Sequence, residues 1–460
     1  MPPGTRDSLD KDDLRPLVLE LLGQIKALVE QNTTLLARIA ELEARAGQPP
    51  KTPANSSVPP SKGQKANCLD APAARKGRKG RPGVARLLCP DPDHTREIFA
   101  EVCGCGAPLS LADQLDVHAY DYVDLPVIRP VTTRIHLHKG QCPRCRRRVV
   151  AKPPADMPPG SPFGPNIVSA VTYLHACQMV SYSRLTEVMG GLFGLTFSKG
   201  AIANMLRRAA RPFAAEADAI AEIVRTSPVI ASDETSARVC GKTWWQWTFV
   251  AATAVYHTIV PTRGKIVPVE FLGGAKPKVW ISDRLAAQCN HAEAHQVCLA
   301  HLIRDAQYAF DAGDTIFAPA FKSFLQRACA IGRRRPDLAD ATIRAHARAL
   351  GRERDRVLSL PAAVTAGAEL RASVSVGARE KLLVFMTRRD VEPTNNVSEQ
   401  ALRMSVIFRR VTNGFRSVWG AESYADIRSI AATGQLHGRS PLTSIRAALV
   451  APSAPVAAPA

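Results

Sequence analysis

A heptad pattern of apolar residues runs without a break from Leu14 to Leu42. Leucine recurs every seven residues, and the alternate positions hold β-branched residues and a single asparagine. The leucines are Leu14, Leu21, Leu28, Leu35 and Leu42, and the alternate positions are Val18, Ile25, Asn32 and Ile39. The pattern predicts a parallel two-stranded coiled coil over residues 12–45, because one asparagine pair is satisfied only in matched register. A single amphipathic helix that packs on its own protein is the alternative.

A polar segment without periodicity, residues 46–86, follows this helix and is predicted to be a disordered linker. It begins with proline-rich sequence and ends with basic residues interleaved with glycines. Extended segments of this composition can enter a narrow minor groove, so Arg78, Lys79 and Arg81 are candidates for non-specific DNA contacts. A solvated charged segment is the alternative.

Residues 160–226 have the apolar spacing of helices throughout. We expect one helix over 165–177, a short one over 183–189 and a third from Ser198, its N-cap, to residue 214. This outline fits a helix-turn-helix DNA-binding domain whose last helix presents Arg207 and Arg208. A three-helix bundle without any role in DNA binding would give the same pattern.

Short apolar and β-branched runs replace the helical pattern after residue 227 and predict an α/β core over residues 227–440. The expected strands cover 229–233, 243–250, 254–260 and 278–283, and a further short strand runs into a helix near residue 298. Residues 303–388 are rich in Ala, Arg and Leu and predict a helical insertion in this core, with residues 441–460 as a tail.

Two of these apolar runs end in a carboxylate, Asp233 and Asp283, which we expect at strand tips of one sheet. Hard Mg²⁺ or Mn²⁺ ions prefer carboxylate oxygens, so the pair can share divalent cations. Glu399 lies about one turn inside a helix that starts after Pro393, on a partly apolar stripe where an acid needs a positive partner. We expect it to meet the same metals in a site for polynucleotidyl transfer. An ordinary Glu399–Arg403 surface pair is the alternative.

The cysteines predict metal ligands and free thiols, because the chain has eleven of them, an odd number, and no export signal. Within residues 87–155, strands over 117–125 and 131–138 would form a hairpin flanked by two cysteine pairs. The pairs are Cys103 with Cys105 and Cys142 with Cys145, and Cys89 and His94 are substitute ligands. We expect a structural Zn²⁺ site of the zinc-ribbon type, or else a small strand module with free thiols.

Cys298 and His301 form a separate C-x-x-H motif. Two ligands alone do not complete a metal site, so a packing role, or a supporting role beside the acidic ligands, is favoured over direct metal binding.

The net charge of +19 over 460 residues suits a polyanionic partner, and the length indicates several domains. A basic surface is expected downstream of Glu399, formed by Arg403, Arg409, Arg410, Arg416 and Arg428. No run of about 18 apolar residues is present and the N-terminus has no apolar signal segment, so we expect a cytoplasmic protein without membrane contact.

These motifs and their order resemble the transposases of the insertion sequence 66 family. The resemblance rests on Asp-Glu-Thr at 233–235, Asp283, the C-x-x-H motif at 298–301 and Pro-Thr-Asn-Asn-x-x-Glu-x-Ala-Leu-Arg at 393–403. It also covers the order of parts, including Asn-Ser-Ser…Pro-Pro-Ser at 55–61 in the linker. The departures are the short spacing of the first cysteine pair and Gln400, where an arginine is common beside the glutamate.

The resemblance implies a bacterial, nucleoid-associated DDE transposase with a ribonuclease H-like core, in which Asp233, Asp283 and Glu399 hold two Mg²⁺ ions. We therefore expect an α+β multidomain protein that cleaves DNA and transfers strands as a homodimer or higher assembly. Helper proteins encoded in the same element, as in many elements of the family, are further candidate partners. The competing hypotheses are a ribonuclease H-like nuclease that never joins strands and a dimeric, zinc-containing DNA-binding regulator. The regulator leaves the three acids unexplained.

Overall fold

The computed structural model of the chain describes residues 11–46, 48–56 and 86–450. It divides into two compact units. The larger comprises Met1–Gly63, Pro154–Leu185 and Lys199–Ala460, and the smaller comprises Gln64–Pro153 and Thr186–Ser198. No helix in the described part of the chain is long and apolar enough to cross a membrane.

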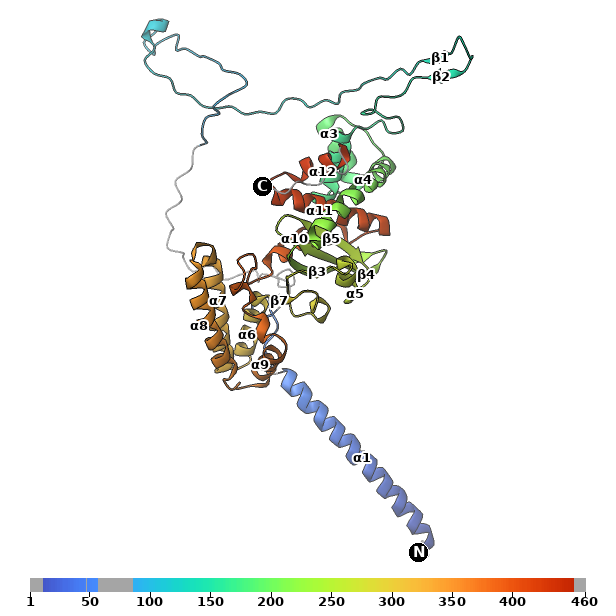
Figure 1. Cartoon of the computed structure of the whole chain (residues 1–460), viewed down its shortest axis with the longest axis vertical. Helices are drawn as coiled ribbons and strands as arrows, with labels where there is room; N and C mark the ends of the chain where they lie inside the picture. Colours follow the sequence, from blue (N-terminus) through green and yellow to red (C-terminus); the bar gives the residue numbers. More distant parts are fainter. Residues whose placement is uncertain (1–10, 47, 57–85, 451–460) are drawn as a thin grey trace, which may run out of the picture. The chain divides into compact units, whose positions relative to one another are not determined.

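The heptad segment forms one helix, α1 (Lys11–Ala46), as predicted (Figure 1). Its apolar seam is exposed in the single chain, with Leu21 at 47%, Ile25 at 56%, Leu28 at 57% and Leu35 at 58%. Burying such a seam against a second helix is what drives coiled-coil formation. The helix is therefore confirmed, while its pairing with a second copy stays a prediction.

The start of the predicted disordered linker is ordered, which corrects that prediction for residues 48–56. The amide of Asn55 donates to Asp311 Oδ2 at 2.9 Å and accepts the backbone N–H of Thr52 at 2.7 Å. Asn55 and Ser56 are buried despite their polarity, because their side chains are hydrogen-bonded. Proline-rich composition indicated disorder but did not reveal this contact. Residues 57–85, with Arg78, Lys79 and Arg81, lie outside the described residues.

A five-stranded mixed sheet forms the centre of the larger unit, in the order β5-β4-β3-β6-β7 (Figure 1). Its strands are β3 (Val229–Val239), β4 (Lys242–Val250), β5 (Val255–Val260), β6 (Val279–Ser282) and β7 (Ala294–Val297). The first three pair antiparallel, and β6 and β7 run parallel to β3. The four strands predicted in the core, and the short one leading into a helix, are confirmed.

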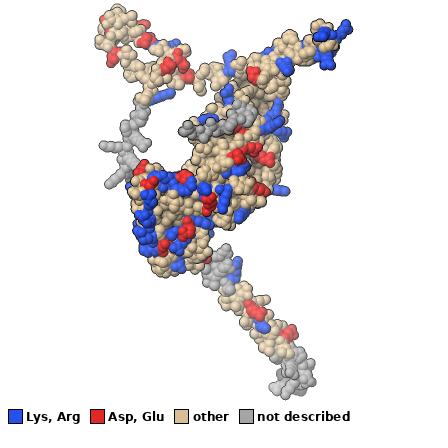
Figure 2. Space-filling model, in the orientation of Figure 1, with Lys and Arg blue, Asp and Glu red and all other residues tan. Residues whose placement is uncertain are grey.

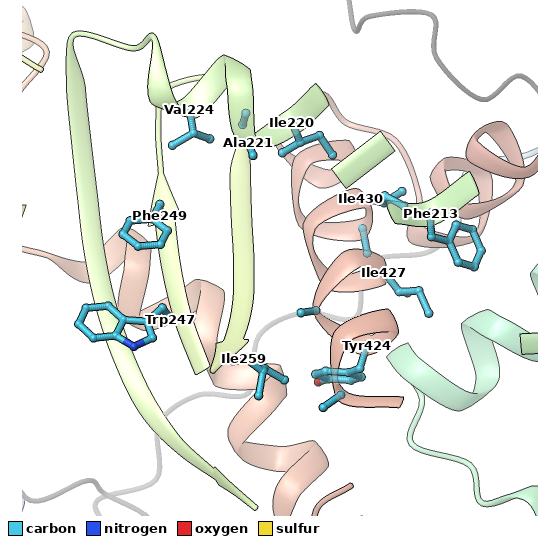
Figure 3. Close-up of a cluster of buried hydrophobic side chains, with 14 of the residues drawn as sticks. Phe213, Ile220, Ala221, Val224, Trp247, Phe249, Ile259, Tyr424, Ile427 and Ile430 are labelled. Carbon is cyan, nitrogen blue, oxygen red and sulfur yellow. The ribbon is translucent and has the colours of Figure 1, made fainter. Parts of the chain in front are cut away.

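Helices from both ends of the larger unit cover one face of this sheet. They are α2 (Pro165–Thr172), its π-helical extension η3 (Tyr173–Cys177), α4 (Lys199–Arg225), α5 (Ile266–Leu272), α11 (Val418–Leu436) and α12 (Pro441–Val450). Phe213 and Ile220 of α4 share one core with Trp247 and Phe249 of β4 and with Ile427 of α11 (Figure 3). The predicted helices of 160–226 are present, but α2 and α4 complete the core of the sheet and do not form a separate domain. The predicted tail is corrected too, because α12 buries Ile445 and Ala448 in this core.

Ionised Asp426 on α11 lowers the free energy of unfolding in a pH-dependent way, and Asp426→Asn should remove this destabilisation. Burial, with the nearby carboxylates of Asp218 and Glu422, raises its pKa from 3.8 to about 7. A raised folded-state pKa means that stability is lost as pH rises from about 4 to about 7. Asp426→Asn should therefore raise the free energy of unfolding by on the order of 2 kcal/mol above pH 7. This increase should shrink as the pH falls towards 4. Thermal melts of wild type and variant between pH 4 and pH 8 measure this effect. A stabilisation that does not vary with pH would contradict the prediction. The control Glu422→Gln, at an exposed neighbour, should stabilise the protein less.

The predicted helical insertion is confirmed and covers the opposite face of the sheet. Its helices are α6 (Leu299–Asp311), α7 (Phe317–Arg334), α8 (Asp340–Leu358) and α9 (Thr365–Gly377), drawn as a bundle in Figure 1. Three short 3-10 helices complete this side: η5 (Arg335–Asp337), η6 (Arg379–Lys381) and η7 (Val384–Met386). A fourth, η4 (Ala286–Gln288), lies on the other face, where Ala287 packs against the core shared with α5. Arg335 is only 2% exposed despite its charge, because its guanidinium donates to the carbonyls of Phe385 and Arg389.

Helix α10 (Asn396–Thr412) packs on β3 and returns to it through a tight loop at Gly414. Gly414 has φ +97°, and a Cβ there would lie 2.4 Å from the carbonyl oxygen of Arg238. Gly414→Ala should therefore lower the free energy of unfolding by about 3 kcal/mol, through backbone strain and overpacking together. Urea unfolding of the full-length chain measures it. Gly438→Ala is the matched control, because Gly438 has φ +69° but nothing within 4 Å of the added Cβ, and it should cost about 1 kcal/mol. Equal losses for the two variants would show that the contact with Arg238 carries no cost.

The cysteine module of the smaller unit differs from its prediction. Residues 117–125 and 131–138 form no strands; β1 (Lys139–Gln141) and β2 (Arg148–Val150) flank Cys142 and Cys145 instead. The predicted hairpin had suitable residue types but no apolar surface to cover it, and its large side chains are exposed. A short helix η2 (Leu111–Asp113) also lies in this unit, and the predicted second helix, α3 (Tyr182–Phe193), spans the boundary between the units.

Candidate active site

The parallel pairing of β3 with β6 brings the two predicted aspartates together. Ala231 pairs with Ile281, and continuing this register by two residues places Asp283 beside Asp233. Neighbouring strands lie about 4.8 Å apart, so the two side chains are adjacent. Asp283 directly follows the end of β6, as predicted, but Asp233 is inside β3, because β4 pairs with β3 out to Val239. The prediction that β3 ends at Asp233 is therefore wrong. The neighbouring strand β6 is the one that ends beside Asp233, at Ser282.

The three predicted acids lie within electrostatic range of one another, although within the described residues their ligand atoms are not gathered at a single point. Burial raises the pKa of Asp233 well above its usual value, and the carboxylates of Glu234, Asp283 and Glu399 raise it further. Its Oδ1 accepts one backbone N–H, from Glu234 at 2.9 Å. Asp283 Oδ1 likewise accepts the N–H of Leu285 at 2.9 Å. Negative charge accumulates here without an equal number of neighbouring cations, which is the setting of a divalent-cation site.

Glu399 lies in the first turn of α10, as predicted, and faces α6. Its Oε1 is 3.6 Å from His301 Nδ1 and 3.8 Å from an Arg304 nitrogen. Within the described residues these are its ion-pair partners, so the alternative surface pair with Arg403 is not formed. Arg304 was missed from the sequence, although it lies one helical turn after His301 and follows the C-x-x-H motif.

Asn395 connects the three elements that carry the site, and sequence analysis gave it no role beyond the start of a helix. Its side-chain amide donates to the carbonyl of Ser232, next to Asp233, at 2.9 Å. Its backbone N–H donates to Cys298 Sγ at 3.2 Å, and its carbonyl accepts the N–H of Glu399 at 3.2 Å. Asn395 is 1% exposed and precedes α10 without capping it through its side chain. An asparagine at an N-cap position normally caps the helix, so only the structure could reveal this other use.

Glu234, the residue after Asp233, has its own cation and is not an open ligand. Its Oε1 accepts from Arg263 Nε at 2.9 Å and from a terminal nitrogen of Arg263 at 2.6 Å. Its Oε2 accepts from Gln288 at 2.7 Å. Successive residues of a strand point to opposite faces, so Glu234 is directed away from the face of Asp233. Burial nevertheless raises its pKa, with Asp283 adding to the shift and Arg263 opposing it.

The C-x-x-H motif lies beside Glu399 and contributes two further ligand atoms. Cys298 is the N-cap of α6 and is fully buried, and His301 lies in the first turn of that helix. Cys298 Sγ, a ring nitrogen of His301 and one oxygen of Glu399 are all within 4.8 Å of one another. The motif alone gave only two ligands; the fold brings Glu399 to it as a third.

The predicted basic residues after Glu399 divide into exposed and buried members. Arg403, Arg410 and Arg416 are exposed, whereas Arg409 is half-buried and donates to Ser236 Oγ at 2.7 Å. Arg409 and Arg410 line a hollow together with Arg238, Thr243 and other residues of β3 and β4. Arg428, expected on the same surface, is only 4% exposed, because α11 packs its side chain into the core of the larger unit. That part of the prediction is wrong.

The two arginines predicted to contact DNA from the third helix are exposed and are also engaged within the protein. The Arg207 guanidinium lies 5.0 Å from the ring centroid of Trp419, a cation–π contact. Arg208 donates to the carbonyl of Gly160 at 2.6 Å.

The two cysteine pairs of the smaller unit each form a tight turn with the same hydrogen bonding. Cys103 and Cys142 each donate a backbone N–H to the carbonyl beyond the turn, at 2.9 Å, and each accepts an N–H through its own carbonyl at 2.8 Å. A residue with positive φ, Gly106 or Arg146, closes each turn. Among the described residues, however, the four thiols are not gathered at one point.

The larger unit is therefore an α/β core, a mixed sheet between two helical layers with Asp233 and Glu234 on its central strand. The family model of the transposase IS66 family matches residues 160–423, more than half of the chain and all of this site. The chain therefore belongs to the transposase IS66 family. Membership implies a DNA-processing enzyme that binds DNA and uses divalent metal ions. No curated protein gives a significant match to the chain.

Proposed function

We propose that this transposase cleaves DNA at the ends of an insertion sequence and transfers the 3′ ends to target DNA, with Asp233, Asp283 and Glu399 as the catalytic acids. The proposal is supported by the pairing of β3 with β6, which brings Asp233 and Asp283 to adjacent strands, and by the carboxylates of Asp283 and Glu399, which both raise the pKa of Asp233. The strand order, with three antiparallel strands followed by two parallel ones, agrees with the ribonuclease H-like core expected from the family resemblance.

The donor atoms of the site fit Mg²⁺ or Mn²⁺. Asp233, Asp283 and Glu399 offer only carboxylate oxygens, which hard cations prefer. Glu399 Oε1 is buried without a hydrogen bond and has only the longer ion pairs of 3.6 and 3.8 Å with His301 and Arg304, so it can still accept a metal ion. When bound, a pair of these ions activates the attacking water or 3′-hydroxyl and stabilises the leaving oxygen. The protein itself orients the three acids on β3, β6 and α10, and Asn395 ties the start of α10 to β3 and to the start of α6.

Two basic surfaces of the larger unit support DNA binding. One is the hollow beside Arg409 and Arg410. The other lies on the insertion, where Figure 2 shows Lys and Arg gathered over α7 and α8. On α8 an exposed arginine recurs every four residues, at Arg344, Arg348, Arg352 and Arg356. None of these four forms an ion pair with an acid in the described part of the chain, so their charge remains available to phosphates.

We also propose that α1 pairs two copies of the chain and that the two cysteine turns close one structural Zn²⁺ site. The exposed heptad seam supports the first proposal. The shared turn geometry supports the second, because each turn presents two thiols as half of a tetrahedral site. Four thiolates leave no open position, so this zinc would have a structural role.

The decisive experiment incubates the full-length protein with candidate element ends and Mg²⁺ and maps the resulting 3′ ends. The expected result is a defined nick at each end, followed by joining when pre-cut ends and target DNA are supplied. Cleavage without joining would favour the nuclease of the same fold. DNA binding that is indifferent to Mg²⁺, with no cleavage under any condition, would favour the DNA-binding regulator.

A further inference from the structure

Three ligand atoms of different chemistry meet where α6 and α10 begin. Cys298 Sγ, a ring nitrogen of His301 and a carboxylate oxygen of Glu399 lie within 4.8 Å of one another, a spread that one metal ion can span. His301 Nδ1 and Glu399 Oε1 are both buried and lack a hydrogen-bond partner. Buried polar atoms without partners are rare in folded proteins and call for an explanation.

Cys298 Sγ is buried at the start of α6, where Cys298 is the N-cap. Its Sγ accepts the backbone N–H of Asn395 at 3.2 Å. Thiolates at helix N-termini and next to metals are stabilised by such surroundings.

We propose that Cys298, His301 and Glu399 bind one late transition-metal ion, Zn²⁺ foremost, at a site distinct from the one formed around Asp233 and Asp283. A thiolate and an imidazole favour Zn²⁺ over Mg²⁺, which prefers oxygen ligands. Arg304, 3.8 Å from Glu399 Oε1, now balances the charge of that carboxylate, and the bound ion replaces it as partner.

This site shares Glu399 with the Mg²⁺ site, so its functional consequence rests on the proposed function. A Zn²⁺ ion held by Cys298 and His301 engages Glu399 and withdraws it from Asp233 and Asp283. Zinc binding therefore competes with assembly of the Mg²⁺ site, and Zn²⁺ is an inhibitor of cleavage that acts through Cys298.

Zinc titration of the full-length protein against a competing chromophoric chelator tests the binding. Cys298→Ala should lower the affinity for one of the bound zinc ions by at least about a hundredfold. Even the loss of a group that only supports a metal ligand lowers metal affinity 10–100-fold. Cys177→Ala is the matched control, because Cys177 is also buried but lies in the core of the other sheet face. It should keep the wild-type stoichiometry. The exposed cysteine pairs contribute equally to all three proteins and cancel in the comparison.

Cobalt substitution gives a second readout that needs no DNA. Co²⁺ bound to a thiolate absorbs by charge transfer, and part of this band should disappear in Cys298→Ala and remain in Cys177→Ala. His301→Gln provides an independent test if Cys298→Ala does not fold. Wild type and both site variants binding the same number of ions with the same affinity would overturn the proposal.

Cleavage assays separate this inference from the proposed function. Added Zn²⁺ should inhibit Mg²⁺-dependent cleavage by wild type and by Cys177→Ala to the same extent. If zinc binds at Cys298 but does not inhibit cleavage, the proposed competition between zinc binding and assembly of the Mg²⁺ site is refuted. A protein that binds zinc as described but never cleaves DNA would instead refute the proposed function and leave the metal site standing.

Discussion

Replacing Asp233 by Asn should lower Mg²⁺-dependent cleavage at least about a thousandfold. The amide retains the shape of the side chain but loses the anionic oxygen that Asp233 offers to a cation. Metal-supplied stabilisation of the transition state amounts to several kcal/mol, and each 1.4 kcal/mol is a factor of about ten in rate. DNA affinity, measured by gel shift in the same buffer, should stay within a few-fold, because the basic surfaces are untouched.

The neighbouring acid gives a matched control for this result. Glu234 lies next to Asp233 in β3 but is held by Arg263 and Gln288 on the other face, so Glu234→Gln should retain far more activity. Both variants remove one negative charge from the same strand. Cleavage that survives Asp233→Asn, or that falls equally in Glu234→Gln with the fold intact, would refute the assignment of Asp233 as a metal ligand.

Asn395→Ala should lower cleavage 10- to 100-fold without touching any ligand. Asn395 is the residue that ties α10, and so Glu399, to β3 through the carbonyl of Ser232. Removing this hydrogen bond frees the start of α10, and groups that orient metal ligands typically contribute a factor of this size. The variant should also need more Mg²⁺ for half-maximal rate, which general destabilisation alone would not cause.

The next residue provides the comparison, since Asn396 is exposed and opens the same helix. Asn396→Ala should leave both the rate and the Mg²⁺ requirement near wild type. If Asn395→Ala changes thermal stability but neither the rate at saturating Mg²⁺ nor the Mg²⁺ requirement, its role is structural only and positioning of Glu399 does not depend on it.

Several elements could be predicted from the sequence because their signals are local. The heptads of α1, the aromatic and β-branched runs of β4 and β5, and the helix start before Glu399 depend on residue type and spacing within a few turns or one strand. Strand-end and helix patterns singled out Asp233, Asp283 and Glu399, the family resemblance implied their shared role, and the structure places the charges of Asp283 and Glu399 near Asp233. Local patterns misled where burial decided the outcome. Residues 117–125 had the composition of a strand but no partner surface, and Arg428, predicted on a basic surface, proved to be buried.

The chain's own pattern thus determined which segments become helices and strands, and which acids are available for chemistry. Only the tertiary structure decided which residues far apart in the sequence come into contact. Asn55 meets Asp311 across 256 residues, Asn395 meets Ser232 across 163, and Glu399 comes to lie beside Cys298 and His301. The physical reason is that helix and strand formation depends on contacts within a few residues. Shared ligands and buried hydrogen bonds instead depend on how the elements pack, which spacing along the chain does not specify.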